Sequence, residues 1–315
     1  MLDQDRTRMA RGPGDRIGVL AAGTELFRYH YRPDLPPSEC PSPYVHPLRT
    51  LAGRVVSGHR PHDHRWHKGL AMTASHLSGQ NFWGGGTYTP GAALDATPGT
   101  PAGRYVDLPN VGRQDHLGFT SLGEDGFTET LGWITAEGEE WIREHRTVTV
   151  RDVDPAGGSW TLEFATELRN VRGAELRFGS PTVFGRELAS YCGFFWRGPR
   201  SFAGGRVLAA DGLEGPEVMG AVSPWLAYIG EHDEVDGHAT VLFRPDPSDE
   251  EGGRPHWFVR SEPVPMVNPT LAFREERPLA DGAVLARRYR VTVADGAWDR
   301  ARIAAHLDAH PWDPR

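Results

Sequence analysis

The sequence concentrates titratable side chains in one short stretch, residues 60–70. His62, His64 and His67 fall within six residues of one another, and Asp63 lies between the first two. Imidazole changes its protonation state near neutral pH and is also a common metal ligand. The stretch therefore predicts either acid–base catalysis or metal binding, and we expect the rest of the chain to build a scaffold that presents it.

Acid–base chemistry is the first hypothesis. Proton transfer on a sugar ring needs an acid and a base poised near neutral pH, and we expect His64 and His67 to fill these roles. His46, from a neighbouring segment, and Arg197 would polarise the substrate, since a guanidinium binds carboxylates and stabilises developing oxyanions. The candidate carboxylate partners are Asp63, Glu129 and Glu144. The alternative is that the histidines only cross-link the loop through backbone hydrogen bonds.

Our first expectation is that the protein uses no cofactor. The alternative is that the same histidines bind a divalent metal ion. In an extended strand, His62 and His64 would point to the same side. His67 or a distant Glu would complete a Zn²⁺ or Fe²⁺ site, in a lyase, hydrolase or oxygenase. Asp63 would face away from both neighbours in such a strand, which weakens the metal hypothesis.

Aromatic residues supply the evidence for a carbohydrate ligand. The chain has 10 tryptophans, and aromatic faces stack on the C–H faces of sugars. We expect Trp141 and Trp160 to belong to the core. The expected substrate-binding residues are Asp63, Trp83, Trp196, His256 and Trp257. A non-catalytic sugar-binding module remains a third hypothesis.

Composition and charge argue against several other functions. The net charge of −8 disfavours nucleic acids and anionic membranes as partners. Cys40 and Cys192 lack CxxC spacing, and the segment 1–14 lacks the apolar core of a signal peptide. No apolar run is long enough to span a membrane, so we expect a cytoplasmic protein. GxSxG, P-loop and dinucleotide-binding motifs are also missing from the sequence.

The strand pattern predicts an all-β fold. Short β-type segments recur from residue 17 to residue 293, and 38 glycines and 26 prolines punctuate them. We expect a disordered tail over 1–15 and one large antiparallel β-sandwich domain over 16–315. Helical periodicity is confined to Trp298–His310, which predicts a short C-terminal helix. The aromatic content would suit a homodimer.

Several segments resemble, in order, the PmoA-like family, often labelled "methane oxygenase". They are Tyr44–Pro47, Pro61–Leu70, Asn81–Gly84, Tyr191–Arg200, His256–Arg260 and Tyr289–Gly296. A membrane-bound oxygenase subunit would need transmembrane helices, which this sequence lacks. The resemblance implies instead a β-rich supersandwich similar to galactose-mutarotase-like domains, found mostly in bacteria that degrade carbohydrates. The family pattern Asp-His-x-x-His-x-Gly-Leu places its two histidines at His64 and His67.

Overall fold

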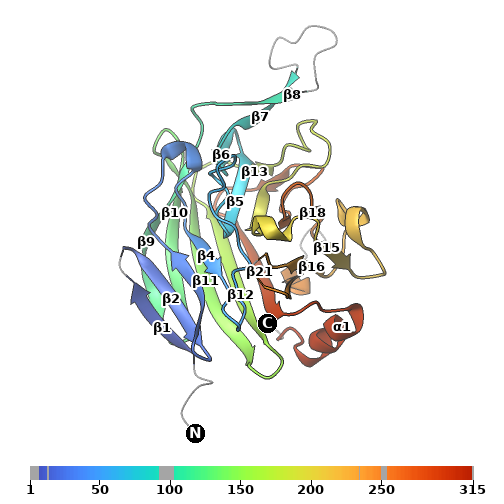
Figure 1. Ribbon diagram of the computed structural model, residues 1–315. Coiled ribbons are helices and arrows are strands. Elements are labelled where there is room, and N and C mark those ends of the chain that lie inside the picture. The colour runs from blue at the N-terminus through green and yellow to red at the C-terminus, as the bar shows by residue number, and fades with distance from the viewer. Residues whose placement is uncertain (1–6, 13, 92–102, 234, 250–253, 314–315) are drawn as a thin grey trace.

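Two antiparallel sheets face each other and enclose the core (Figure 1). The computed structural model describes residues 7–12, 14–91, 103–233, 235–249 and 254–313. Within these residues, one sheet has 11 strands, the other has 8, and a separate ribbon has 2. The all-β sandwich expected from the sequence is confirmed.

The larger sheet follows a path of eight neighbouring strands, from which three others branch. The path is β1 (Arg8–Gly12), β2 (Arg16–Ala21), β3 (Thr24–His30), β4 (Tyr44–Leu48), β5 (Leu70–Leu77), β14 (Cys192–Arg197), β19 (Met266–Pro269) and β18 (Trp257–Arg260). The branching strands are β6 (Gln80–Phe82), β13 (Leu176–Gly179) and β20 (Arg277–Leu279).

The smaller sheet lies against the inner face of the larger one. Its strands, in spatial order, are β15 (Arg206–Ala209), β16 (Leu226–Glu231), β17 (His238–Pro245), β21 (Val284–Asp295), β12 (Ser159–Asn170), β11 (Glu140–Asp154), β10 (Gly126–Ile134) and β9 (Arg113–Leu122). The strands β7 (Thr87–Pro90) and β8 (Gly103–Val106) form the ribbon that projects at the top of Figure 1. Short 3₁₀ turns include η1 (Pro37–Glu39), η3 (Arg200–Phe202), η4 (Gly215–Val218) and η5 (Pro247–Asp249).

The N-terminal segment differs from the sequence prediction. A disordered tail was expected over 1–15, but Arg8–Gly12 forms β1 and pairs with β2. Met9 is its one partly buried apolar anchor on the core. An edge strand needs hydrogen bonds from only one neighbour, so a short, charged sequence can occupy this position without a clear apolar pattern.

The alternation of side chains along β14 decides which residues reach the core. Phe194 and Trp196 point between the sheets, where Phe194 meets Phe164 at 4.7 Å between ring centroids. Phe195 and Arg197 point to the opposite, outer face of the larger sheet. This period of two follows from strand geometry and places Arg197 beside the histidine-rich loop.

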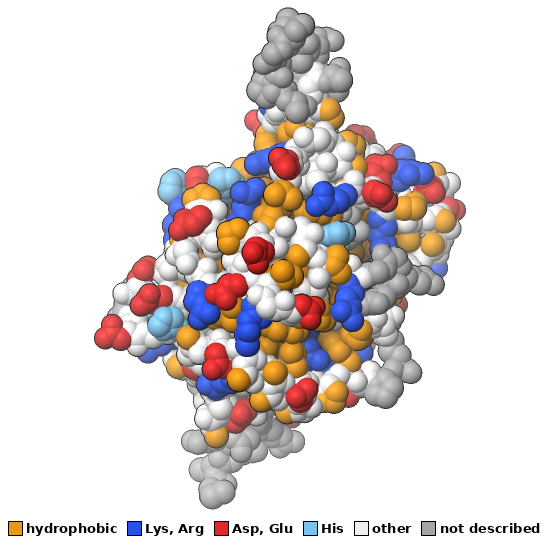
Figure 2. Space-filling model, turned by 90° about the vertical axis from the view of Figure 1, so that its right-hand side faces the viewer, with side chains coloured by type: hydrophobic (Ala, Val, Ile, Leu, Met, Phe, Trp, Pro, Cys, Tyr) orange, Lys and Arg blue, Asp and Glu red, His pale blue; other side chains and the backbone are white. Residues whose placement is uncertain are grey.

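The predicted C-terminal helix is present as α1 (Arg300–Ala309), at the lower right of Figure 1. Its N-cap is Asp299, whose side chain accepts a hydrogen bond from Arg302 N at 2.8 Å. Ile303 and Trp298 pack on the outer face of the smaller sheet. Figure 2 shows this side of the molecule, where exposed hydrophobic side chains lie among dispersed acidic and basic ones.

A network of charged groups lies inside the sandwich. Glu144 accepts hydrogen bonds from Arg146 Nε at 2.8 Å and Nη2 at 2.9 Å, and all of these groups are buried. Glu129 accepts from the Tyr29 hydroxyl and lies 2.5 Å from His116 Nδ1. Both carboxylates point inward, so the expectation that they partner the loop histidines is wrong.

No helix among the described residues has the length and apolar character needed to cross a bilayer. Cys40 and Cys192 are both buried and free.

Candidate functional site

The histidine-rich loop, residues 59–68, folds as two successive turns rather than as a strand. His64 N donates to Pro61 O at 3.0 Å, and His67 N donates to His64 O at 3.0 Å. Arg60 N closes the loop by donating to His67 O at 2.8 Å. The expected strand geometry, with His62 and His64 pointing to one side, is therefore wrong, and His62 is exposed.

Backbone hydrogen bonds clamp the base of this loop to the end of β14. Gly58 N donates to Arg197 O at 2.8 Å, and Arg197 N donates to Gly69 O at 2.7 Å. Gly69 has φ +48°, and a Cβ there would lie 2.1 Å from Val45 O. Glycine is therefore required at this position, and the clamp holds the loop next to Arg197.

Two cationic side chains of the loop serve as anchors. Arg60 binds both carboxylate oxygens of Glu39, at 2.7 and 2.8 Å. Lys68 is buried and donates to Glu39 O at 2.8 Å, to Ser42 Oγ at 3.1 Å and to Cys40 O. Burial lowers the pKa of Lys68 to about 8. These contacts engage Arg60 and Lys68 in holding the loop on the segment that contains Glu39.

His67 is buried and its ring is oriented by Arg197. Its Nδ1 accepts a hydrogen bond from Arg197 Nη1 at 3.1 Å, so the ring proton belongs on Nε2. Burial and the adjacent Arg197 cation hold the pKa of His67 well below its usual value. His67 is therefore a neutral imidazole whose Nε2–H can donate a hydrogen bond.

His64 is the exposed member of the pair, with 45% of its side-chain surface accessible. Its Nδ1 lies 3.2 Å from Asp63 Oδ2, and Asp63 Oδ1 accepts a 2.5 Å hydrogen bond from Arg200 Nη2. Desolvation acts to raise the pKa of Asp63, but a hydrogen bond from its own backbone, the contact with His64 and the charge of Arg200 lower it overall. The geometry of the contact between His64 and Asp63 is that of an ion pair rather than of a hydrogen bond, because Nδ1 has no hydrogen-bond partner among the described residues. The nearby carboxylate favours a proton on Nδ1 electrostatically, which leaves Nε2 as the acceptor.

The two rings lie together against an aromatic surface. The centroids of His64 and His67 are 5.0 Å apart, and His67 lies 4.9 Å from Trp83. Trp83 stacks on Tyr191 at 5.2 Å with an interplanar angle of 6°. Trp66 packs 5.1 Å from His64 at the edge of the same surface. The outer face of β14 thus combines an imidazole pair with an aromatic platform.

Trp66 packs tightly on the chain between β6 and β7. A Cβ at Gly84 would lie 2.7 Å from Trp66 Cβ, and a Cβ at Gly85 would lie 2.7 Å from the indole ring. Beyond Trp66 lies an open cavity of about 600 Å³, which Glu39, Arg65 and Trp66 help to line. His64 and His67 are not among its lining residues.

Residues 16–308 match a protein family described as "Family of unknown function (DUF6807)". The chain belongs to this family. No curated protein and no solved structure gives a significant match.

Two of the predicted substrate-binding tryptophans belong to the core of this DUF6807 domain. Trp196 and Trp257 each have 0% exposed surface. Their indole N–H groups donate to Val56 O at 3.0 Å and to Ser223 O at 2.8 Å. The expectation that they contact substrate is wrong, because strand alternation turns them toward the smaller sheet. Trp141 and Trp160 are buried, as expected.

His46 lies on the same face of the sheet but in a different cluster. Its ring stacks on His59 at 4.9 Å, and its Nδ1 is 2.8 Å from Ser57 Oγ. Burial, with the neighbouring histidines, lowers the pKa of His46 to about 3. Among the described residues, no ring contact joins it to His64 or His67, so the structure does not bring the three together.

His256 marks the far end of the aromatic surface. Its Nδ1 lies 2.9 Å from Gly220 O, and its ring stacks on Phe273 at 5.3 Å. Phe273 belongs to the same hydrophobic cluster as Trp83.

The sequence did not predict Arg200 and Tyr191 as site residues, although they are the two ends of the segment Tyr191–Arg200. Their closeness in sequence to Arg197 was the one feature that could have indicated them as site residues.

The side chains of the loop do not converge as metal ligands. Across the residues that the structure describes, no group of three or more His, Cys, Asp or Glu side chains is placed to hold a metal ion. His67 Nδ1 is occupied by Arg197, and Asp63 is turned to Arg200 and His64.

Proposed function

We propose that the protein is a carbohydrate-active enzyme that moves a proton on a sugar or an oxidised sugar. His64 acts as the general base through Nε2 and returns the proton it has taken, and His67 polarises the substrate through a hydrogen bond from Nε2–H. The reaction class is epimerisation, elimination or hydrolysis. The observation that carries the proposal is the pair of neighbouring imidazoles, one 3.2 Å from the Asp63 carboxylate and the other hydrogen-bonded by Arg197 at 3.1 Å.

The complementary orientation matters because acid–base catalysis needs one acceptor and one donor at the same time. A carboxylate beside Nδ1 favours the tautomer of His64 in which Nε2 is the acceptor. A guanidinium at Nδ1 has the reverse effect on His67, which stays neutral and offers a proton. The environments thus push the two histidines toward different roles, as paired catalytic groups require.

The aromatic platform supports a sugar as the substrate. Trp66, Trp83 and Tyr191 lie next to the imidazole pair, and Tyr191 and Trp66 are partly exposed. Such faces stack on the C–H faces of a pyranose ring. Arg197 and Arg200 place two cations on the same side, which would favour a substrate that carries a carboxylate. The resemblance to PmoA-like and galactose-mutarotase-like proteins fits this substrate class.

The proposal includes the cellular compartment and the binding partner. Two buried free thiols suit a reducing cytoplasm. The partner is a small carbohydrate, with neither nucleic acid nor membrane involved, and a homodimer remains compatible with the surface. The proposed proton transfer between the substrate and His64 requires no metal.

The proposal can be tested by following C–H exchange for epimerisation or elimination and bond cleavage for elimination or hydrolysis. The protein would be incubated in D₂O with neutral monosaccharides, uronic acids and disaccharides, and C–H exchange and bond cleavage would be followed by proton NMR. His64→Gln should lower the rate by roughly 10²–10⁴-fold. His62→Gln is the matched control in the same loop and should leave the rate unchanged, because His62 is exposed and outside the pair.

Two outcomes would contradict the proposal. Activity that disappears in a chelator and returns with a divalent ion would mean that the histidines bind metal. Binding of a sugar without any turnover, at an affinity that His64→Gln leaves intact, would mean a non-catalytic binding module.

A further inference from the structure

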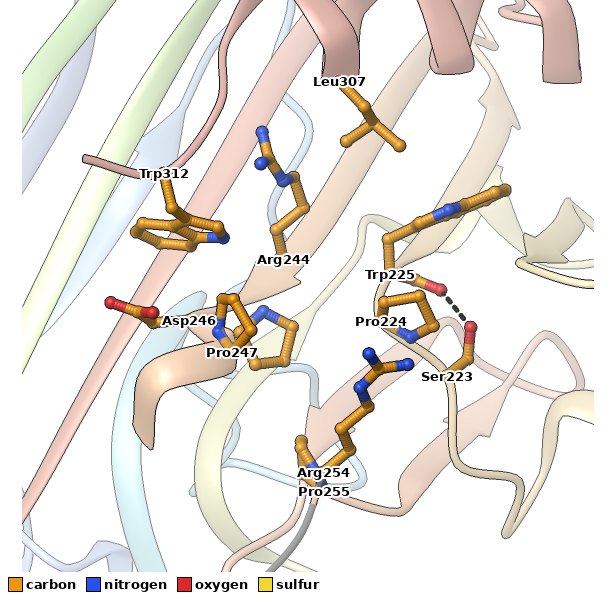
Figure 3. A pocket seen from close by; sticks show the side chains of 11 residues that line it. Ser223, Pro224, Trp225, Arg244, Asp246, Pro247, Arg254, Pro255, Leu307 and Trp312 are labelled. Carbon is orange, nitrogen blue, oxygen red and sulfur yellow. Dashed lines mark hydrogen bonds between the residues drawn. The ribbon is translucent and has the colours of Figure 1, made fainter. Parts of the chain in front are cut away.

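A second cavity lies on the other side of the molecule, under α1. It occupies about 220 Å³ between the segment Ser223–Trp225, the end of β17, η5 and Trp312, which follows α1 (Figure 3). These elements differ from those that build the histidine-rich loop. Any ligand here would therefore bind independently of the proposed catalytic site.

Three charged residues line this cavity, the buried Arg244 and Asp246 and the exposed Arg254, and Arg244 is its buried cation. Arg244 is only 8% exposed, and Nη1 donates to His310 O at 2.9 Å. Among the described residues, this is its one hydrogen bond, although a guanidinium has five N–H donors. Figure 3 shows the side chain rising between Trp312 and Trp225. Arg244 thus presents unsatisfied donors to the cavity.

The neighbouring arginines each pair with a carboxylate, whereas Arg244 pairs with none of the described carboxylates. Arg288 lies 2.6 Å from Asp246, and Arg290 lies 2.9 Å from Glu163. No carboxylate in the described part of the chain lies within ion-pair distance of Arg244. Burial and the charge of Arg290 lower the pKa of Arg244 to about 10 against the opposing charges of Asp152 and Asp246, so the group stays cationic at neutral pH without direct contact to any carboxylate that the structure describes. A buried cation in this state favours an anion.

The walls of the cavity are apolar and flat. Trp225 and Trp312 are partly exposed and lie on opposite sides of Arg244 in Figure 3. The Trp312 ring already contacts the guanidinium groups of Arg244, Arg288 and Arg290, so Trp225 is the more open of the two faces. The hydroxyl of Ser223 donates to Trp225 O at 2.9 Å and fixes the backbone of this wall. Prolines line the remaining sides. The volume is below the roughly 300–1,000 Å³ typical of sites for larger ligands, so it suits a single ring.

We propose that this cavity binds an organic carboxylate with one ring. The carboxylate pairs with Arg244, and the ring lies against Trp225 and Trp312. A sugar acid and an aromatic acid share this chemistry, since both combine one carboxylate with a flat apolar face.

Calorimetric titration of the full chain with four probes tests the proposal. Glucuronate and benzoate carry the carboxylate, whereas glucose and benzyl alcohol are their neutral counterparts. We expect at least one acid to bind about 10-fold or more tightly than its neutral counterpart. A preference for glucuronate would identify a sugar-acid site, and a preference for benzoate an aromatic-acid site.

Variants assign the binding to this cavity. Arg244→Met should weaken acid binding at least about 10-fold, because it removes the cation and keeps an unbranched apolar stem. Arg206→Met removes an exposed arginine, paired with Glu214 at 3.1 Å, and should leave affinity unchanged. Trp225→Ala keeps the cation and should weaken binding several-fold, so it decides the question if Arg244→Met does not fold.

Three results would overturn the proposal. They are no binding of either acid up to about 10 mM, equal affinity for acids and neutral counterparts, or equal affinity in wild type, Arg244→Met and Trp225→Ala. Glucuronate is also a candidate ligand of the histidine-rich loop. For that reason only the affinity that Arg244→Met or Trp225→Ala removes counts toward this cavity, and His64→Gln should leave that part unchanged.

Discussion

The histidine-rich loop and the polar network inside the sandwich are built from the same residue types, a histidine with carboxylates and an arginine. Inside the sandwich, Glu144 accepts hydrogen bonds from Arg146, Trp133 and Thr166, and nothing in this group is exposed. In the loop, His64 keeps 45% of its side-chain surface accessible, and its Nε2 is free to meet a ligand.

The difference between the two regions lies in how far their hydrogen-bonding capacity is used. A buried group whose donors and acceptors are all matched holds the fold in one arrangement and cannot react. A group with one matched nitrogen and one open nitrogen is oriented but remains available. The interior network is therefore structural, and the loop is the candidate for chemistry.

The largest expected effect is on the interior network. Glu144→Gln would leave the buried Arg146 without its counter-ion and should lower the free energy of unfolding by about 3–5 kcal/mol. Glu140→Gln is the matched control on the same strand, because its partner Arg143 is 41% exposed. It should cost at most about 1 kcal/mol. Urea denaturation measures both, and equal losses would erase the distinction between a sealed network and a surface pair.

An intermediate effect is expected from acid. Burial lowers the pKa of His46 to about 3 and that of His59 to about 4, so both stay neutral in the folded chain. The unfolded chain takes up these protons below pH 6.5, so stability falls as the pH drops from 6.5 toward 4. His46 alone should contribute about 2 kcal/mol over that interval.

Denaturation at pH 6.5 and pH 4.5 would measure this loss. His46→Gln should reduce the difference between the two pH values, whereas His62→Gln, at an exposed position, should not. A wild type that is equally stable at both pH values would contradict the neutral state of this histidine stack.

The smallest expected effect concerns the contact that orients His64. Asp63→Asn removes the carboxylate that favours a proton on Nδ1 and should lower kcat about 10-fold with KM nearly unchanged. Stability should change little, since Asp63 is 39% exposed. Asp115→Asn, in the exposed pair with Arg113, is the matched control. A change in KM alone would indicate that Asp63 binds substrate, as the sequence suggested, rather than orienting His64.

The sequence predicted the loop and named Asp63 and Arg197 as candidate residues, but it did not predict how they pair. The density of histidines around His64 and His67 was visible directly, and the structure brings these two rings together. The contact between Arg197 and His67 could not be predicted, because Arg197 comes from a strand 130 residues away in sequence. Glu129 was a plausible partner by type, but Tyr29, 100 residues earlier, binds it inside the core.

The tryptophans show the same limit. Trp196 and Arg197 are neighbours in sequence and were expected at one site, yet strand alternation sends them to opposite faces of the sheet. The alternation of side chains along a strand can be recognised in a sequence, but it does not show which face of the sheet the second sheet covers. The smaller sheet covers the face that carries Trp196, and the histidine-rich loop lies over the other.

By itself, the sequence determined the all-β architecture, the terminal helix and the position of the titratable loop. These depend on local patterns: strand alternation, turn residues and the spacing of like side chains along the chain. Only the tertiary structure decided that Asp63 and Arg197 orient the two imidazoles, while Glu129 and Glu144 are sealed inside. Such pairings depend on which strands become neighbours, and that is set by the burial of the whole core rather than by any one segment.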